Sequence, residues 1–229
     1  TNDQDIKIGK ELMKYILEIR NLSHAYDQAT STIKDFNFSL KKGEIVSILG
    51  PSGIGKTTLL RIVAGLEDVV DGEVKIREKV VSKKNFILPP EKRNLGLVVE
   101  DRALFPHLNI ERNVMFGISH IQERESLAQE YLELFKVAEL SKKYSHEISA
   151  GQQQRVAFAR ALITNPDILL LDEPFGALDK NLKEELHGET KKIFKDKDLS
   201  VLLVTHDEEE AKYFSDRIIE FQEDKIIIR

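Results

Sequence analysis

The chain has 229 residues, 41% hydrophobic and 32% charged, a balance typical of one α/β domain with room for a smaller subdomain. Its 34 basic and 39 acidic residues give a net charge of −5, which argues against a nucleic-acid coat, since phosphate backbones are held by excess Lys and Arg. The absence of cysteine excludes disulfides, thiolate nucleophiles and Cys-ligated metals.

The first hundred residues read mainly as strands. Residues 1–12 are polar, lack the apolar centre of a signal peptide, and are expected to be an N-terminal extension or an appended remnant. Five later segments alternate or run apolar as strands do: 15–20, 33–40, 44–49, 73–76 and 95–99. Helical spacing of apolar residues predicts a helix over 57–66. The polar stretch around Pro89 and Pro90 predicts no regular interior element.

The remaining residues predict helices followed by parallel strands. Apolar residues three and four apart predict amphipathic helices over 126–140 and 152–163. The segments after Pro166 predict two buried strands, a charged helix between them and a final hairpin of two edge strands. They are 168–171, 201–204, 180–195 and 217–228. One α/β core carrying a helical insertion is therefore expected.

A glycine-rich loop follows the predicted strand at 44–49 and precedes a predicted helix. Its residues fit the pattern G-x-x-x-x-G-K-[ST]: Gly50, Pro51, Ser52, Gly53, Ile54, Gly55, Lys56 and Thr57. The glycines let successive N–H groups point at phosphate oxygens, and the helix adds its positive end. Lys56 would contact the β and γ phosphates, and the Thr57 hydroxyl can ligate Mg²⁺. The motif alone indicates an NTPase or a kinase.

Two carboxylates directly follow the predicted strand at 168–171. Asp172 and Glu173 therefore lie at its carboxyl end, where ligands bind in open α/β sheets. Asp172 can hold Mg²⁺ through water, and Glu173 is placed to polarise a water attacking the γ phosphate. A strand that simply ends in solvated acids is the alternative. His206 follows the strand at 201–204 and suits a sensor of the γ phosphate, although a lone histidine is usually uninvolved.

From Tyr15 onward the chain resembles the ATP-binding subunits of ABC transporters. The segment Ser149-Ala150-Gly151-Gln152-Gln153-Gln154-Arg155 resembles the signature of that family and precedes a predicted helix. The resemblance implies a P-loop NTPase core, a mixed β-sheet flanked by helices, with an antiparallel β subdomain and an inserted α-helical signature subdomain. One domain over 13–229 is implied, with the core at 13–99 and 164–229 and the helical subdomain at 100–163.

The family pattern also implies the roles of particular residues. Tyr26 would stack on adenine, with a plain core aromatic as the alternative. The signature would bind the ATP held by the phosphate loop of a second copy, and Ser149 can also be an ordinary N-cap of the following helix. Glu173, His206 and Lys56 would be catalytic, and Thr57, Asp172 and Glu100 would hold Mg²⁺. The implied ATP contacts are Tyr26, Gly50, Pro51, Ser52, Gly53, Ile54, Gly55, Lys56, Thr57, Thr58, Ser149, Ala150, Gly151, Gln152 and Asp179. The loop Ala177-Leu178-Asp179 would cross the dimer interface.

The same resemblance implies partners. Two copies would pair head to tail around two ATP. Exposed side chains of Leu104 and Phe105, in the segment 102–107, would receive transmembrane permease subunits, and a solute-binding protein would act upstream. The chain would then work at the cytoplasmic face of the membrane, without nucleic acid. A buried hydrophobic staple is the alternative for Leu104 and Phe105.

Two positions depart from the family pattern. Glu100 stands where the family usually has glutamine, which adds a negative charge near the γ phosphate and predicts altered Mg²⁺ affinity or coupling. Ala150 replaces the first glycine of the signature. Its methyl group disfavours a positive φ, so activity is expected to survive if that position has a negative φ.

Segments 88–96 and 105–108 resemble importers that serve iron(III), polyamines, sulfate, molybdate or sugars, and iron(III) or a polyamine ranks first. Soluble ATP-gated proteins of DNA repair or chromosome structure share this core, but they need a long heptad insertion, and no sustained heptads occur here. A catalytically impaired ATP-binding partner is a further alternative, disfavoured because Lys56, Asp172, Glu173 and His206 are all present.

Overall fold

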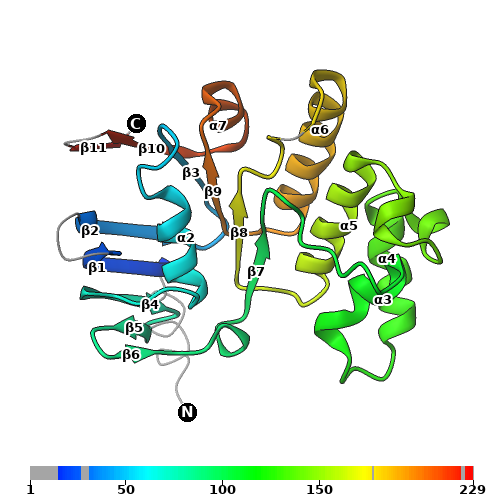
Figure 1. Cartoon of the computed structure of the whole chain (residues 1–229), viewed down its shortest axis with the longest axis horizontal. Helices are drawn as coiled ribbons and strands as arrows, with labels where there is room; N and C mark the ends of the chain where they lie inside the picture. The colour runs from blue at the N-terminus through cyan, green and yellow to red at the C-terminus, as the bar shows by residue number, and fades with distance from the viewer. Residues whose placement is uncertain (1–14, 27–30, 177, 223–224, 229) are drawn as a thin grey trace, which may run out of the picture. The chain divides into compact units, whose positions relative to one another are not determined.

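A computed structural model describes residues 15–26, 31–176, 178–222 and 225–228 of the chain (Figure 1). They form two compact units. Unit 1 comprises the described residues of Thr1–Arg93 and Lys197–Arg229, and unit 2 those of Asn94–Asp196. The predicted extension at 1–12 lies outside the described residues, as does Ala177. None of the described helices is long and apolar enough to cross a bilayer.

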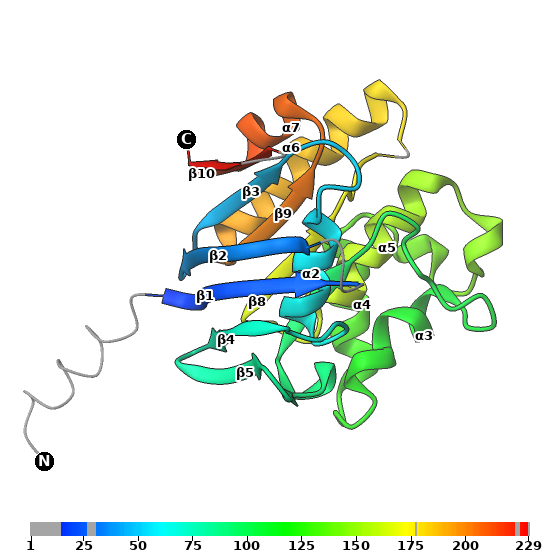
Figure 2. The same ribbon diagram turned by 60° about the vertical axis from the view of Figure 1, so that its left-hand side comes forward.

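Unit 1 contains an antiparallel sheet in the order β2-β1-β4-β5-β6; the first four of these strands are labelled in Figure 2. Its strands are β1 (Tyr15–Ala25), β2 (Ser31–Lys41), β4 (Asp71–Ile76), β5 (Lys79–Lys83) and β6 (Phe86–Ile87). The expectation of no regular element around Pro89 was wrong for β5 and β6. They were overlooked because each is short and partly exposed, and because the prolines lie just beyond them, in a 3-10 turn at Pro90–Lys92.

A second set of strands in unit 1 is mainly parallel. These are β3 (Ile45–Leu49), β9 (Val201–Thr205), β10 (Arg217–Gln222) and β11 (Lys225–Ile228). β3 pairs in parallel with both β9 and β10, and β11 pairs antiparallel with β10. The prediction of two edge strands at 217–228 was therefore wrong for β10, which has a neighbour on each side. Local sequence carries no signal for this, because β3 is a remote partner.

Two helices of unit 1 pack near these strands. α2 (Lys56–Ala64) contacts β9, and α7 (Glu208–Phe214) contacts β3 and β9. Asp207 is the N-cap of α7, and its carboxylate accepts hydrogen bonds from the backbone N–H groups of Glu209 and Glu210. An aspartate N-cap followed by acidic residues is a recognisable helix start, but α7 was not predicted from the sequence.

Unit 2 pairs two parallel strands with helices (Figure 1). The strands are β7 (Leu95–Val98) and β8 (Ile168–Asp172), and the helices are α3 (Ile110–Met115), α4 (Arg124–Leu134), α5 (Ala150–Leu162) and α6 (Lys180–Asp196). The predicted helix over 126–140 ends early, because Lys136 has a φ of 57°, which no helix interior tolerates. A 3-10 turn at Ala138–Leu140 follows.

Candidate nucleotide-binding site

The phosphate loop of unit 1 connects β3 to α2. β3 is buried along its first four residues, as expected of an apolar run in a parallel sheet. Gly53 and Gly55 have φ of 82° and 103°, which side-chain-bearing residues rarely adopt. A Cβ on Gly55 would lie 2.9 Å from the Thr32 carbonyl oxygen, while one on Gly53 would meet no atom of the described residues within 4 Å. The loop therefore turns tightly at Gly55 and is open at Gly53.

Lys56 and Thr57 begin α2 at the end of this loop. The Lys56 ammonium donates to the carbonyl oxygens of Gly50 at 2.8 Å and Pro51 at 2.9 Å, and the residue is buried. Thr57 is exposed. Among the described residues, no side chain caps the first turn of α2, whose N-cap is Gly55. This helix start thus combines a positive helix end with a lysine, as an anion site requires.

Tyr26 lies at the end of β1, next to the same helix. Its hydroxyl is 3.1 Å from the Thr58 hydroxyl, and His24 meets its ring edge-on at 4.6 Å. The ring is nevertheless 63% exposed. Thr58 lies in the first turn of α2, so the structure brings this aromatic ring to the phosphate loop and leaves it open to stacking.

His206 lies beside the start of the phosphate loop. Leu49, the last residue of β3, is the register partner of Thr205, the last residue of β9. Gly50 and the exposed His206 therefore leave adjacent strands at the same edge of the sheet. Tyr26, the loop and His206 thus all lie within unit 1, and their roles at ATP stay predictions.

The acidic residues gather in unit 2. Val98 of β7 pairs with Leu171 of β8, so Glu100 and Glu173 both follow the carboxyl ends of neighbouring strands. A Cβ on Gly176 would lie 3.8 Å from an oxygen of each carboxylate, which makes the two side chains neighbours. Glu173 has a φ of 45°, a strained value for a residue with a side chain, and strain of this kind clusters at functional sites.

The signature segment forms the start of α5. The Ser149 hydroxyl accepts a hydrogen bond from the Gln152 N–H at 3.3 Å, and the Gln152 side chain accepts from the Ser149 N–H at 2.9 Å. This is a capping box. Ala150 is the first residue of the helix, where φ is negative, so its methyl group costs no backbone strain. Asp179, directly before α6, makes a single cap bond, accepting from the Leu182 N–H at 3.1 Å.

The segment predicted to receive a partner differs from expectation in one respect. Leu104 and Phe105 are half-buried rather than exposed. The Phe105 ring packs on the Phe116 ring, with centroids 4.4 Å apart, and lies 5.4 Å from the Arg160 guanidinium, so it is partly covered within unit 2. Phe116, which the sequence reading did not single out, is 57% exposed.

The contacts of three buried or half-buried polar side chains were not predicted from the sequence. Asn113, fully buried, pins the 105–109 loop through both backbone groups of Phe105. Arg93 is 2% exposed and donates to carbonyls of α2 and β5, and burial lowers its pKa to about 10. Arg160 donates to the carbonyls of Arg102 and Ala103. Burial lowers the Arg160 pKa, although the Asp101 carboxylate opposes the shift. Polar residues inside a fold leave no periodic signal, which is why they were missed.

These features define the P-loop class of nucleotide-binding folds: a strand, a glycine loop and an uncapped helix start, with acidic residues at strand ends in the same chain. The chain belongs to the ABC transporter family, whose family model matches residues 33–176.

Known proteins of this kind are similar over most of the chain. FbpC 2 of Haemophilus influenzae, an Fe(3+) ions import ATP-binding protein, is 38% identical over 97% of this chain and 63% of its own length. PotA of Borreliella afzelii, a spermidine/putrescine import ATP-binding protein, is 41% identical over 93% and 61%. The chain thus spans under two thirds of these relatives.

A solved structure supports the fold. The dimeric, post-hydrolysis state of the ATP-binding cassette MJ0796 bound to ADP and Pi is 31% identical, with a TM-score of 0.79, over 92% of this chain and 97% of that one.

Proposed function

We propose that this chain is the ATP-hydrolysing subunit of an importer, and that two copies close around two ATP to drive partner membrane subunits. The observation that carries the proposal is the phosphate loop, where Lys56 and an uncapped helix start meet a site open at Gly53. Family membership and the dimeric, nucleotide-bound cassette support the pairing.

Residues of the chain have the donor chemistry that an ATP–Mg²⁺ complex requires. Mg²⁺ usually takes one or two carboxylates, a hydroxyl and phosphate oxygens. The exposed Thr57 hydroxyl and the half-buried Asp172 carboxylate supply such donors. Bound Mg²⁺ would neutralise charge on the β and γ phosphates. Lys56 and the helix N–H groups would hold the phosphates, and Glu173 would accept a proton from the attacking water.

The second copy would complete each site. Ser149 and Gln152 use one hydrogen-bond pair to cap α5, and the remaining N–H groups of that first turn can meet a phosphate oxygen. Asp179 lies in the loop that would cross between copies. Tyr26 would stack on adenine, and His206 would contact the γ phosphate.

A surface pocket in unit 2 supports the proposed membrane partner. Its volume is about 580 Å³, and its lining includes Leu108, Met115 and the exposed Phe116. Phe105 packs behind Phe116. An amphipathic helix of a permease subunit would place apolar side chains in such a pocket. The working place would be the cytoplasmic face of the membrane, and a solute-binding protein would deliver the cargo.

Iron(III) or a polyamine is the proposed solute class, because FbpC 2, an Fe(3+) import protein, and PotA, a spermidine/putrescine import protein, align over nearly all of this chain. Purification of the chain with its membrane subunits, followed by ATPase stimulation with iron(III) or spermidine, would separate the two cargoes.

The test of hydrolysis is phosphate release by the purified chain with ATP and Mg²⁺. Glu173→Gln should lower the rate by about 100-fold or more, since a general base typically contributes 10²–10⁴-fold. Glu184→Gln, which removes an exposed carboxylate of α6, should leave the rate unchanged. Equally slow rates in wild type and Glu173→Gln would contradict hydrolysis and favour an impaired ATP-binding partner.

A further inference from the structure

Helices α5 and α6 touch at their first turns. A Cβ added to Gly151 would lie 2.5 Å from Leu182 Cδ2 and 2.9 Å from its Cδ1. Real Cβ atoms essentially never approach that closely. The backbone of α5 therefore packs directly on the Leu182 side chain, and a larger residue at position 151 would require that side chain to shift.

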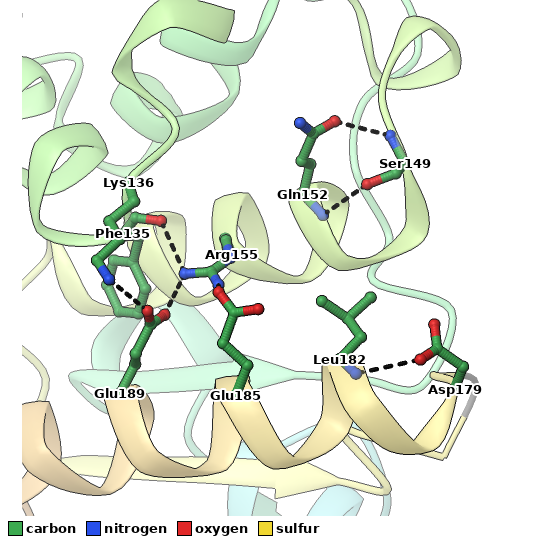
Figure 3. A network of polar contacts seen from close by, with 9 residues as sticks. All are labelled: Phe135, Lys136, Ser149, Gln152, Arg155, Asp179, Leu182, Glu185 and Glu189. Atoms are coloured by element: carbon green, nitrogen blue, oxygen red, sulfur yellow. Dashed lines mark hydrogen bonds and ion pairs between the residues drawn. The ribbon is translucent and has the colours of Figure 1, made fainter.

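One turn further along, the two helices are joined by charge (Figure 3). Arg155 of α5 donates to the Glu185 carboxylate at 2.8 Å and to the Glu189 carboxylate, both on α6. It also donates to the Phe135 carbonyl oxygen at 3.4 Å. The Arg155 side chain is only 8% exposed. A guanidinium bonded to two carboxylates while excluded from water holds its geometry better than a surface ion pair does.

Glu189 receives a second cation from outside the two helices. Lys136 donates to its other oxygen at 2.6 Å, with a side chain that is 68% exposed. Burial alone would raise the pKa of Glu189, but the hydrogen bonds from Lys136 and Arg155 outweigh burial and lower it. Glu189 is therefore ionised, and Arg155 is the cation that ties it to α5.

The contacts fix the direction of the helices. Gly151 and Arg155 are four residues apart, and their partners Leu182 and Glu185 advance along α6 in the same sense. The start of α5 thus lies beside the start of α6, as Figure 3 shows, with the caps Ser149 and Asp179 at the same end.

We propose that Arg155 is a positioning residue that locks α5 to α6, so that Ser149 and Asp179 meet the ATP of the second copy as one rigid element. The proposal rests on the shared ATP site of the proposed function. Without the lock, each cap would have to be ordered separately when two copies close, and that ordering would weaken dimerisation.

The first test measures hydrogen exchange in the protein without nucleotide. Arg155→Gln should speed exchange in the first turns, 150–153 and 180–183, by about tenfold, since exchange reports local opening. Exchange in β3 should not change. Lys136→Met is the matched control, because it also removes a cation from Glu189. Lys136 does not join the two helices, so exchange in this variant should match wild type.

The second test measures ATP-dependent dimerisation in the Glu173→Gln background, by sedimentation. Arg155→Gln should raise the dimer dissociation constant by about tenfold, while ATP affinity of the single copy stays within about twofold. Should Arg155→Gln fail to fold, Glu185→Gln replaces it in both tests. Glu185 is 59% exposed, and losing one arm of the lock should give the same pattern at about threefold.

Each outcome bears on the proposal. Unchanged exchange in both turns, an equal effect of Lys136→Met, or faster exchange throughout the chain would overturn it. Normal dimerisation of Arg155→Gln would overturn it too. If the Glu173→Gln protein forms no dimer with ATP, the proposed function fails instead, and the exchange comparison still decides the role of Arg155.

Discussion

Gly151→Ala offers a direct test of the contact between α5 and α6. In a signature segment, a glycine can be required for either of two reasons. A phosphate group approaches its backbone closely, or a side chain of the same protein does. The structure favours the second cause, since the space beside Gly151 is filled by Leu182. The two causes predict different behaviour when Leu182 is shortened.

The magnitude follows from the 2.5 Å approach to Leu182 Cδ2, where ordinary contact begins at 3.4 Å. Overpacking of this kind costs about 1–3 kcal/mol of unfolding free energy. Alanine recovers about 0.5–1 kcal/mol over glycine inside a helix. Gly151→Ala should therefore lose between about 0 and 2.5 kcal/mol net, toward the lower end if the Leu182 side chain can shift. Leu182→Ala alone should lose about 1–2 kcal/mol, because that side chain is half-buried.

The assay is a double-mutant cycle in chemical denaturation. If the clash is the cause, Leu182→Ala should relieve it, and the double variant should be more stable than the sum of the single losses by about 1–3 kcal/mol. A coupling energy within about 0.5 kcal/mol of zero would refute the packing argument. Recovery of ATP-dependent dimerisation in the double variant would show that phosphate approach is not the main constraint.

Two further predictions concern Arg93 and Glu100. Arg93→Met should cost about 3–5 kcal/mol of unfolding free energy, because a buried guanidinium bonded to α2 and β5 is removed. The control Arg61→Met, at an exposed arginine, should cost under about 1 kcal/mol. A loss below about 1 kcal/mol for Arg93→Met in denaturant unfolding would contradict the prediction. Glu100→Gln should shift the Mg²⁺ concentration for half-maximal ATPase activity by about threefold, since one of two neighbouring carboxylate charges is lost. Identical Mg²⁺ titrations and identical basal rates would refute the second prediction.

Local patterns were enough to predict the elements that bear the site. The apolar run of β3, the glycine loop and the helical spacing of α2 each carry a period or a motif. The signature segment likewise precedes a predicted helix, α5, which begins at Ala150, two residues before the predicted 152. These features lie in contiguous segments, so their structure follows from short-range sterics and hydrogen bonding.

Long-range pairing was not predictable in the same way. β10 was taken for an edge strand because its neighbour β3 lies far away in the sequence. The early end of α4 depends on Lys136 in a left-handed conformation, and a lysine gives no sign of that, whereas glycine would. The sequence placed Arg155 at the end of the signature but did not predict its ion pairs, because its carboxylate partners lie on α6.

Helix α5 also supports the loop that follows Glu100. Arg102 and Ala103 both have positive φ, at 61° and 43°, which costs free energy for residues with side chains. Arg160 holds both of their carbonyl oxygens, at 2.9 Å and 2.7 Å, and stacks on Phe105. The strained loop therefore persists because a side chain of α5 fixes it. Helix α5 thus contacts α6 through Arg155 and the loop beyond Glu100 through Arg160.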